Sequence, residues 1–238
     1  MSPIPRLPYT PNLPLCYHIF MKGFFIVLEG PDRSGKSTQA KLLEKWLKAN
    51  KKKVLLTREP GGTRLSEQIR EILLDPKGRI EPLTELFLYE TSRAKLTLSI
   101  ILPALKAGKV VVSDRFTMST TAYQGYGRGL PVATVETLNR IASCGVKPDM
   151  TIAFNIPDRI FSERERLAQK HSGPDRMERA SAGFRLRVNR AYKALSRRPG
   201  IVSVNAAGSI EEIHARIKAL VSARLKMKNP VKRIKAKG

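Results

Sequence analysis

Residues 30–37 (GPDRSGKS) have the spacing of a loop that binds phosphate groups. Glycines at both ends let the backbone turn tightly, so that successive N–H groups can point at one anion. The segment follows an apolar run and precedes a helical pattern, and the positive end of that helix would add to the site. Lys36 would bridge the β- and γ-phosphates of a nucleoside triphosphate, and Ser37 would offer its hydroxyl to Mg²⁺. The predicted triphosphate-binding residues are Gly30, Pro31, Asp32, Arg33, Ser34, Gly35, Lys36, Ser37 and Thr38.

Two arginines accompany this loop and indicate phosphoryl transfer rather than hydrolysis. Arg33 lies inside the loop, and Arg115 follows Asp114 at the end of another apolar run. A guanidinium beside a transferring phosphoryl group stabilises the charge that develops there. We therefore interpret Lys36, Arg33 and Arg115 as catalytic, with a solvated loop position as the alternative for Arg33. The chain has neither the NKxD motif of guanine-reading GTPases nor the acidic pair after the third run that a motor ATPase would need.

Short apolar runs alternate with helical patterns along the chain, which predicts an α/β domain with a parallel sheet. The expected strands are 24–28, 54–56, 109–113, 150–154 and 201–204. The expected helices are 38–49, 64–74, 82–107, 131–143, about 158–196, and 209–225 with a capping box at its start.

Composition excludes several classes of protein. The chain has 238 residues, of which 42% are hydrophobic, so it can bury the core of one domain. No apolar run approaches the ~20 residues of a membrane span, and two distant cysteines exclude a disulfide framework. We therefore expect a cytoplasmic protein. The net charge of +24 attracts polyanions, among which nucleic acid is not favoured over phosphorylated metabolites.

The two ends of the chain differ from the rest. Residues 1–22 are proline-rich and lack the features of a secretory signal, so we expect an extension, and translation from Met21 is the alternative. Residues 226–238 form a basic tail, for which a nucleic-acid-binding arm is the alternative reading. The predicted catalytic domain is 23–225.

Four short segments, in this order, resemble thymidylate kinases. Residues 30–37 resemble the GxDRxGKS form of the loop, and residues 57–63 (TREPGGT) match a segment after the second strand. Residues 114–116 (DRF) and 119–125 (STTAYQG) are similar to two further motifs. The resemblance covers about residues 24–221. It implies the three-layer P-loop NTPase fold, with a five-stranded parallel sheet flanked by helices and a mobile lid.

The resemblance implies a site for dTMP as phosphoryl acceptor. Asp32 would contact the 3′-hydroxyl, and Arg115 would hold the phosphate. Tyr89 would stack on thymine and Arg93 would bond its carbonyl, while Gln124 would read the N3–H edge. Tyr123 would crowd out a 2′-hydroxyl. The implied acceptor residues are Asp32, Glu59, Arg70, Tyr89, Arg93, Arg115, Tyr123 and Gln124, and the implied metal-site residues are Ser37 and Asp114.

Some of these side chains have plain structural alternatives. Tyr89 lies in an apolar stretch and could pack in the core, and Arg93 could be a solvated helix charge. Tyr123 and Gln124 lie in a segment rich in Gly, Thr and Ser, where an ordinary loop is the alternative.

Residues 163–180 resemble the family's lid, which would exclude water from the phosphates. The family's catalytic arginine lies in the loop or in the lid, and this chain has basic residues in both. Arg33 is the preferred candidate, and Arg166, Lys170 and Arg176 are the lid alternatives. Residues 205–209 (NAAGS) resemble a turn that packs against the adenine of the donor, with a plain turn as the alternative.

The resemblance therefore implies an enzyme that uses ATP and Mg²⁺ to phosphorylate dTMP, as a homodimer that binds neither membrane nor nucleic acid. Two alternatives remain. A deoxynucleoside kinase would need a carboxylate base for a neutral hydroxyl, and Glu59 could serve. A P-loop ATPase that binds nucleic acid would fit the positive charge.

Overall fold

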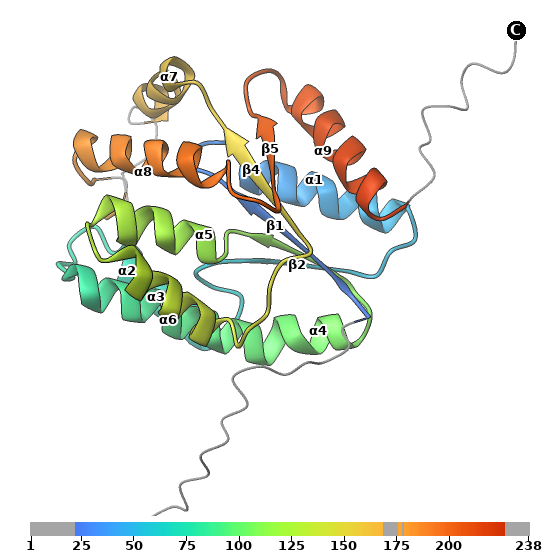
Figure 1. Ribbon diagram of the computed structural model, residues 1–238, viewed down its shortest axis with the longest axis horizontal. Coiled ribbons are helices and arrows are strands. Elements are labelled where there is room, and N and C mark those ends of the chain that lie inside the picture. The colour runs from blue at the N-terminus through green and yellow to red at the C-terminus, as the bar shows by residue number, and fades with distance from the viewer. Residues whose placement is uncertain (1–21, 169–175, 178, 227–238) are drawn as a thin grey trace, which may run out of the picture.

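Five parallel strands form one sheet at the centre of the protein (Figure 1). The structure is a computed structural model and describes residues 22–168, 176–177 and 179–226. The strand order is β2-β3-β1-β4-β5, so the chain changes direction across the sheet around β1. In such a sheet, ligands bind beyond the carboxyl ends of the strands at the point of reversal. The strands are β1 (Phe24–Glu29), β2 (Val54–Arg58), β3 (Val110–Asp114), β4 (Met150–Asn155) and β5 (Ile201–Asn205).

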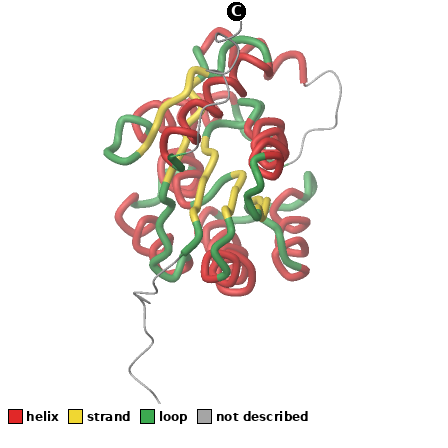
Figure 2. Tube along the Cα trace, turned by 90° about the vertical axis from the view of Figure 1, so that its right-hand side faces the viewer, coloured by secondary structure: helices red, strands yellow, loops and turns green. Residues whose placement is uncertain are grey.

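Helices cover both faces of the sheet, which gives three layers (Figures 1 and 2). The helices α1 (Lys36–Ala49) and α9 (Ile210–Arg224) lie on one face and contact each other. On the other face lie α2 (Arg64–Leu74), α3 (Pro82–Leu96), η1 (Thr97–Ile101), α4 (Leu102–Lys106) and α6 (Val132–Ala142). At the carboxyl edge lie α5 (Thr117–Thr120), η2 (Thr121–Gly127), α7 (Asp158–Ala168) and α8 (Ala182–Leu195).

Alternating side chains of β1 divide the core between the two faces. Ile26 and Leu28 belong to the cluster formed with α1 and α9. Phe25 and Val27 belong to the cluster formed with α3, η1 and α4. All four are at most 1% exposed, because a central parallel strand is covered on both sides. The carboxyl end of β1, where the phosphate loop begins, is therefore held by packing on two faces.

The single helix expected over 82–107 forms as three consecutive helical segments. A π-turn, η1, interrupts the α-helix just before Pro103. Proline has no N–H, and its ring clashes with the carbonyl four residues earlier. The wider π-turn relieves that clash, and the helix continues beyond it.

The segment that contains Tyr123 and Gln124 is helical, so the alternative of an ordinary loop is wrong. A short α-helix, α5, leads into a seven-residue π-helix, η2. Both side chains are buried although they are adjacent in sequence. A π-helix has more residues per turn than an α-helix, and π-turns are frequent at functional sites. The sequence did not predict this helical segment, because glycine and threonine have low helix propensity.

Other expectations are confirmed within about two residues at each end. Helix α9 begins with the expected capping box, in which Ser209 and Glu212 bond each other's backbone N–H groups. The charged helices expected over about 158–196 are α7 and α8. Several expectations fall outside the described residues: residues 1–21 of the extension 1–22, residues 169–175 (with Lys170) and 178 of the lid expected at about 163–180, and residues 227–238 of the basic tail. Within the described part of the chain, none of the helices has both the length and the apolar character that a membrane span requires.

Two glycines of η2 give a matched test of its packing. A Cβ on Gly127 would lie 2.7 Å from Phe184 Cε2, whereas one on Gly125 would come no closer than 3.5 Å to a neighbour. We expect Gly127→Ala to lower the free energy of unfolding by about 1–3 kcal/mol, because η2 must move away from α8. Gly125→Ala is the control, and its effect should stay within about 1 kcal/mol. Urea unfolding measures both values, and equal effects would contradict this account of the packing.

Candidate active site

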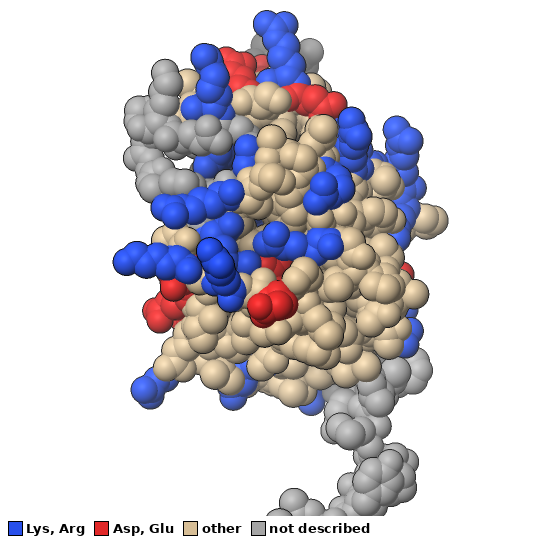
Figure 3. All heavy atoms as spheres, turned by 90° about the vertical axis from the view of Figure 1, so that its left-hand side faces the viewer, with Lys and Arg blue, Asp and Glu red and all other residues tan. Residues whose placement is uncertain are grey.

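Two cavities meet at the carboxyl edge of the sheet. The first, the deep cavity, is lined by all eight residues implied for the acceptor. The second, the loop cavity, is lined by the phosphate loop together with Arg58 and Asp114. Basic side chains gather on this face (Figure 3). The two cavities share a wall formed by Asp32, Glu59, Arg70 and Arg115.

The phosphate loop turns away from β1 at Gly30, whose φ is +153°. A Cβ at this position would lie 2.9 Å from Cβ of Phe154, so only glycine fits without a shift. Lys36 opens α1 and is buried, and its Nζ donates to Pro31 O at 2.6 Å and to Ser34 Oγ at 3.1 Å. Burial and the charge of Arg115 lower the pKa of Lys36 to about 8. An anion bound in the loop would add to the carboxylates of Asp114 and Asp32 and so favour the charged form of this ammonium.

Ser37 and Asp114 lie side by side in the loop cavity. Ser37 Oγ donates a short hydrogen bond to Asp114 Oδ2, whereas Asp114 Oδ1 is buried without a partner. Mg²⁺ usually takes one or two protein oxygens, and phosphate and water oxygens complete its octahedron. The unpartnered carboxylate oxygen beside a hydroxyl fits such an ion. The described residues contain no cluster of three or more His, Cys, Asp or Glu that would form an all-protein metal site.

Arg115 connects the end of β3 to the phosphate loop. Its Nη1 lies 3.0 Å from Gly30 O, Ser119 Oγ and Tyr192 Oη, and its Nη2 donates to Asp32. Its φ is +76°, a left-handed conformation that costs energy for a residue with a side chain. The phosphate loop and β3 are therefore held together by one guanidinium at the wall between the cavities.

Asp32 is held between two partners. Its Oδ1 accepts from Arg115, and its Oδ2 accepts from Tyr123 Oη at 2.6 Å. Burial alone would raise the pKa of Asp32, but the charges of Arg115 and Lys36 outweigh burial and lower it. Asp32 is therefore ionised at neutral pH, and it fixes the phenol of Tyr123 in the deep cavity.

Arg93 is 2% exposed, so the alternative of a solvated helix charge is wrong. Its guanidinium bonds the carboxylates of Glu59 and Glu90, each at 2.8 Å, and Asn139 Oδ1 at 2.6 Å. Nη2 also donates to the Phe116 carbonyl and the Thr120 hydroxyl. All five N–H groups of the guanidinium have protein partners. A hydrogen bond from Arg93 to a base, which stays a prediction, would therefore be shared with one of these acceptors.

Glu59 lies in the shared wall and carries an unusual carboxylate. It is 5% exposed, and Oε1 has no partner, while Oε2 accepts from Arg93. Burial raises the pKa of Glu59 to about 7. The positive charge of Arg93 opposes this rise, and the negative charge of Glu90 adds to it. The carboxyl group therefore exchanges a proton close to neutral pH.

Glu85 lies behind Gln124, which lines the deep cavity. This fully buried carboxylate of α3 bonds Gln124 Nε2 at 2.8 Å and the guanidinium groups of Arg128 and Arg176. Tyr89, also on α3, lines the same cavity and is partly exposed, so it is not only a core residue. Burial and the charge of Glu85 raise the pKa of the Tyr89 phenol.

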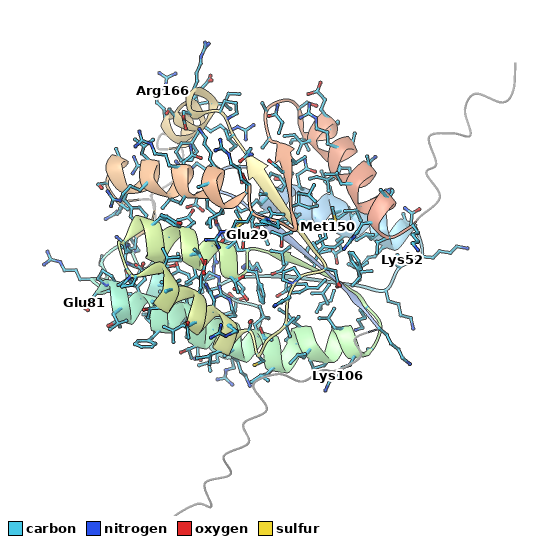
Figure 4. All side chains as sticks on the ribbon, in the orientation of Figure 1. Glu29, Lys52, Glu81, Lys106, Met150 and Arg166 are labelled. Atoms are coloured by element: carbon cyan, nitrogen blue, oxygen red, sulfur yellow. The ribbon has the colours of Figure 1, made fainter. Side chains whose placement is uncertain are left out.

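The basic candidates of the lid lie in different places. Arg166 is exposed at the outer edge on α7 (Figure 4), while Arg33 lines the loop cavity with a φ of +60°. Arg176 donates a hydrogen bond to Glu85 and does not line the loop cavity. Arg164, which the sequence reasoning did not single out, bonds the carbonyls of Arg33 and Ala206. It therefore joins α7 to the phosphate loop and to the 205–209 turn.

Sequence reasoning missed the acidic and polar groups that hold the arginines and tyrosines. Glu29, the last residue of β1, is fully buried in the interior (Figure 4). It accepts hydrogen bonds from the N–H groups of Phe116 and Ser119 and from the hydroxyl of Tyr192. An acidic residue at the end of an apolar strand was the only available signal. The other missed residues are Glu85, Glu90, Arg128, Asn139, Arg164 and Tyr192.

The parallel sheet and the phosphate loop after β1 define a P-loop NTPase fold. The profile of the family described as thymidylate kinase matches residues 28–217. The thymidylate kinase of Pelotomaculum thermopropionicum is 49% identical over 75% of this chain and 82% of the relative. The thymidylate kinase of Halothermothrix orenii is 43% identical over 83% of this chain and 95% of that relative. The crystal structure of the Ehrlichia chaffeensis thymidylate kinase matches with a TM-score of 0.66 and 29% identity, over 84% of this chain and 98% of that one. The chain belongs to the thymidylate kinase family.

Glu59 predicts a pH dependence of stability. Its pKa is about 7 in the folded protein against an ordinary value of 4.5, so between these values the folded state binds more protons than the unfolded state. The free energy of unfolding therefore falls as pH rises from about 4.5 to about 7. In Glu59→Gln this titration is absent, and we expect a shallower fall. Urea unfolding at pH 5, 6 and 7 tests the expectation, and parallel curves for the two proteins would refute it.

Proposed function

We propose that the protein transfers the γ-phosphoryl group of ATP to dTMP, which gives ADP and dTDP. The observation that carries the proposal is the shared wall of Asp32, Glu59, Arg70 and Arg115 between the two cavities. A triphosphate in the loop cavity and a monophosphate in the deep cavity would meet at this wall. Holding two reactants in line converts a bimolecular reaction into an effectively intramolecular one.

The chemistry needs cations and alignment more than a base. A phosphate monoester has a second pKa of ~6, so its attacking oxygen is already anionic at neutral pH. Arg115 lines both cavities, and Lys36 and Arg33 line the loop cavity. In this proposal, Arg115 would neutralise charge on the acceptor, and Lys36 and Arg33 would neutralise charge on the donor. A Mg²⁺ ion held by Ser37 and Asp114 would neutralise charge on the β- and γ-phosphates.

The proposal is tested by ADP release with ATP and Mg²⁺ and different acceptors. We expect turnover with dTMP, less with dUMP and none with thymidine, because thymidine lacks the phosphate that Arg115 would hold. Turnover with thymidine would move the chemistry to a hydroxyl, with Glu59 as its base. Turnover that requires duplex DNA and ignores dTMP would refute the proposal and favour the nucleic-acid-binding ATPase.

The catalytic cation is tested by comparing the loop with the lid. We expect Arg33→Ala to lower kcat at least about a hundredfold while dTMP still binds, because arginine fingers contribute about 10³-fold or more to phosphoryl transfer. Arg166→Ala, which removes an exposed arginine of α7, is the control and should keep most of the turnover. If the two results were reversed, the lid would supply the cation.

We also propose that two copies of the chain pair through α2, α3 and η1. Apolar side chains are about half exposed there: Ile72 at 53%, Leu83 at 50%, Phe87 at 49% and Leu98 at 54%. The helices α2 and α3 contact each other, so these side chains extend over neighbouring elements. A self-complementary apolar patch is the usual basis of a twofold dimer.

The dimer is tested by placing a charge on this patch. Phe87→Glu should weaken association at least about tenfold, because an unpaired carboxylate would be buried between the copies. Ile210→Glu is the control, since Ile210 is 51% exposed on α9, on the other side of the sheet. Sedimentation equilibrium measures the dissociation constants. A wild-type monomer, or equal weakening by both substitutions, would contradict the proposed interface.

We further propose that residues 23–225 form one kinase domain, with a lid at about 163–180. In this proposal, residues 1–22 are an N-terminal extension and residues 226–238 a basic C-terminal tail.

A further inference from the structure

Four hydrogen bonds converge on the carboxylate of Glu85. Oε1 accepts from Gln124 Nε2 at 2.8 Å and from Arg128 Nε at 3.1 Å. Oε2 accepts from Arg128 Nη2 at 2.9 Å and from Arg176 Nη1 at 2.5 Å. Glu85 is 0% exposed, and the four donor atoms belong to Gln124 of η2, to Arg128, which directly follows η2, and to Arg176 in the described part of the lid segment.

Glu85 is ionised in this arrangement. Burial alone would raise its pKa, but the hydrogen bonds from Arg128 and Gln124 and the charge of Arg128 outweigh burial and lower it. An ionised carboxylate has no proton to donate and accepts hydrogen bonds only. Every group that hydrogen-bonds Glu85 must therefore donate a hydrogen, and all four observed donors are N–H groups.

This restriction determines the orientation of the Gln124 amide. A glutamine amide has a donor end and an acceptor end, and the two can exchange by rotation of the terminal torsion. Only the NH₂ end of Gln124 can face Glu85, so the carbonyl oxygen takes the other direction. Gln124 is 1% exposed and lines the deep cavity. The amide therefore offers the cavity an acceptor.

We propose that Glu85 is a positioning residue that sets the base selectivity of the deep cavity. By fixing the Gln124 amide, it favours a pyrimidine that carries N–H at the ring position facing Gln124 over a pyrimidine with an unprotonated nitrogen there. The inference rests on the proposed function, because it takes the deep cavity as the site of a pyrimidine monophosphate. It assigns the discrimination to a residue that touches Gln124 rather than to Gln124 alone.

The chemistry of the bases gives the expected discrimination. Thymine carries a hydrogen on N3, whereas N3 of cytosine is an unprotonated acceptor. An acceptor facing an acceptor leaves both groups unpaired in a buried site, and such sites reject the wrong analogue by about 10⁴-fold or more. An amide at residue 85 would both donate and accept, so Gln124 could then face the cavity with either end.

The test compares dTMP with 5-methyl-dCMP, which keeps the methyl group and differs only at the N3 and C4 edge. The variants are Arg176→Gln and the double variant Arg176→Gln/Glu85→Gln. The double variant loses one carboxylate and one guanidinium together, so the buried charge stays balanced as in the wild type. Thermal unfolding establishes that each variant is folded, and the single variant Glu85→Gln is measured as well.

We expect Arg176→Gln to lower kcat/KM while the ratio of kcat/KM for dTMP to that for 5-methyl-dCMP stays within about threefold of the wild type. Adding Glu85→Gln should reduce this ratio by about a hundredfold or more, partly through a gain in activity with 5-methyl-dCMP. A purely structural role would lower activity with both substrates and leave the ratio unchanged.

The outcomes separate this inference from the proposed function. If the wild type does not phosphorylate dTMP, the proposed function fails before the variants are compared. If it does, and the ratio survives Glu85→Gln in a folded protein, the proposed function stands and Glu85 does not set the selectivity. If Arg176→Gln alone removes the selectivity, the lid guanidinium and not Glu85 fixes the amide.

Discussion

The ion pair between Arg115 and Asp32 is the interaction on which both cavities depend. Arg115 directly follows β3 and Asp32 belongs to the phosphate loop after β1, so the pair joins the ends of two neighbouring strands. The same guanidinium lies within 3.0 Å of Tyr192 on α8, and Asp32 holds Tyr123 of η2. Because the pair lies in the shared wall, any change in its position would move the donor and acceptor sites relative to each other.

Behind this pair, buried carboxylates position the cationic and polar groups of the deep cavity. Glu59 and Glu90 hold Arg93, Glu29 holds Tyr192, and Glu85 holds Gln124. A site that binds two phosphorylated molecules must be electropositive, yet unpaired buried cations are costly. Carboxylates behind the cavity wall balance these charges, while the cavity itself faces its ligands with donors and oriented amides. The raised pKa of Glu59 follows mainly from its burial in this wall, with a smaller contribution from Glu90.

Much of the fold was predictable from sequence, since apolar runs and helical periodicity report local burial. The phosphate loop was predictable because its function depends on contiguous residues. The helical segment 117–127 was not, because its glycines and threonines favour a helix only when packed against α8. The contact between Glu29 and Tyr192 was not predictable either, because 163 positions separate the two residues and the sequence carries no signal for such a pair. Burial of Arg93 likewise depends on Asn139, which comes from a distant helix.

The central claim is that the two cavities meet at one wall, so that donor and acceptor phosphates are aligned. The most direct test is the binding of adenosine joined to thymidine by a 5′–5′ chain of five phosphates, measured by calorimetry with Mg²⁺. A molecule that spans both cavities should bind at least about 10²-fold more tightly than ATP or dTMP alone, and each nucleotide should compete with it. The account would be contradicted if the joined molecule bound no more tightly than ATP and if ATP, but not dTMP, competed with it.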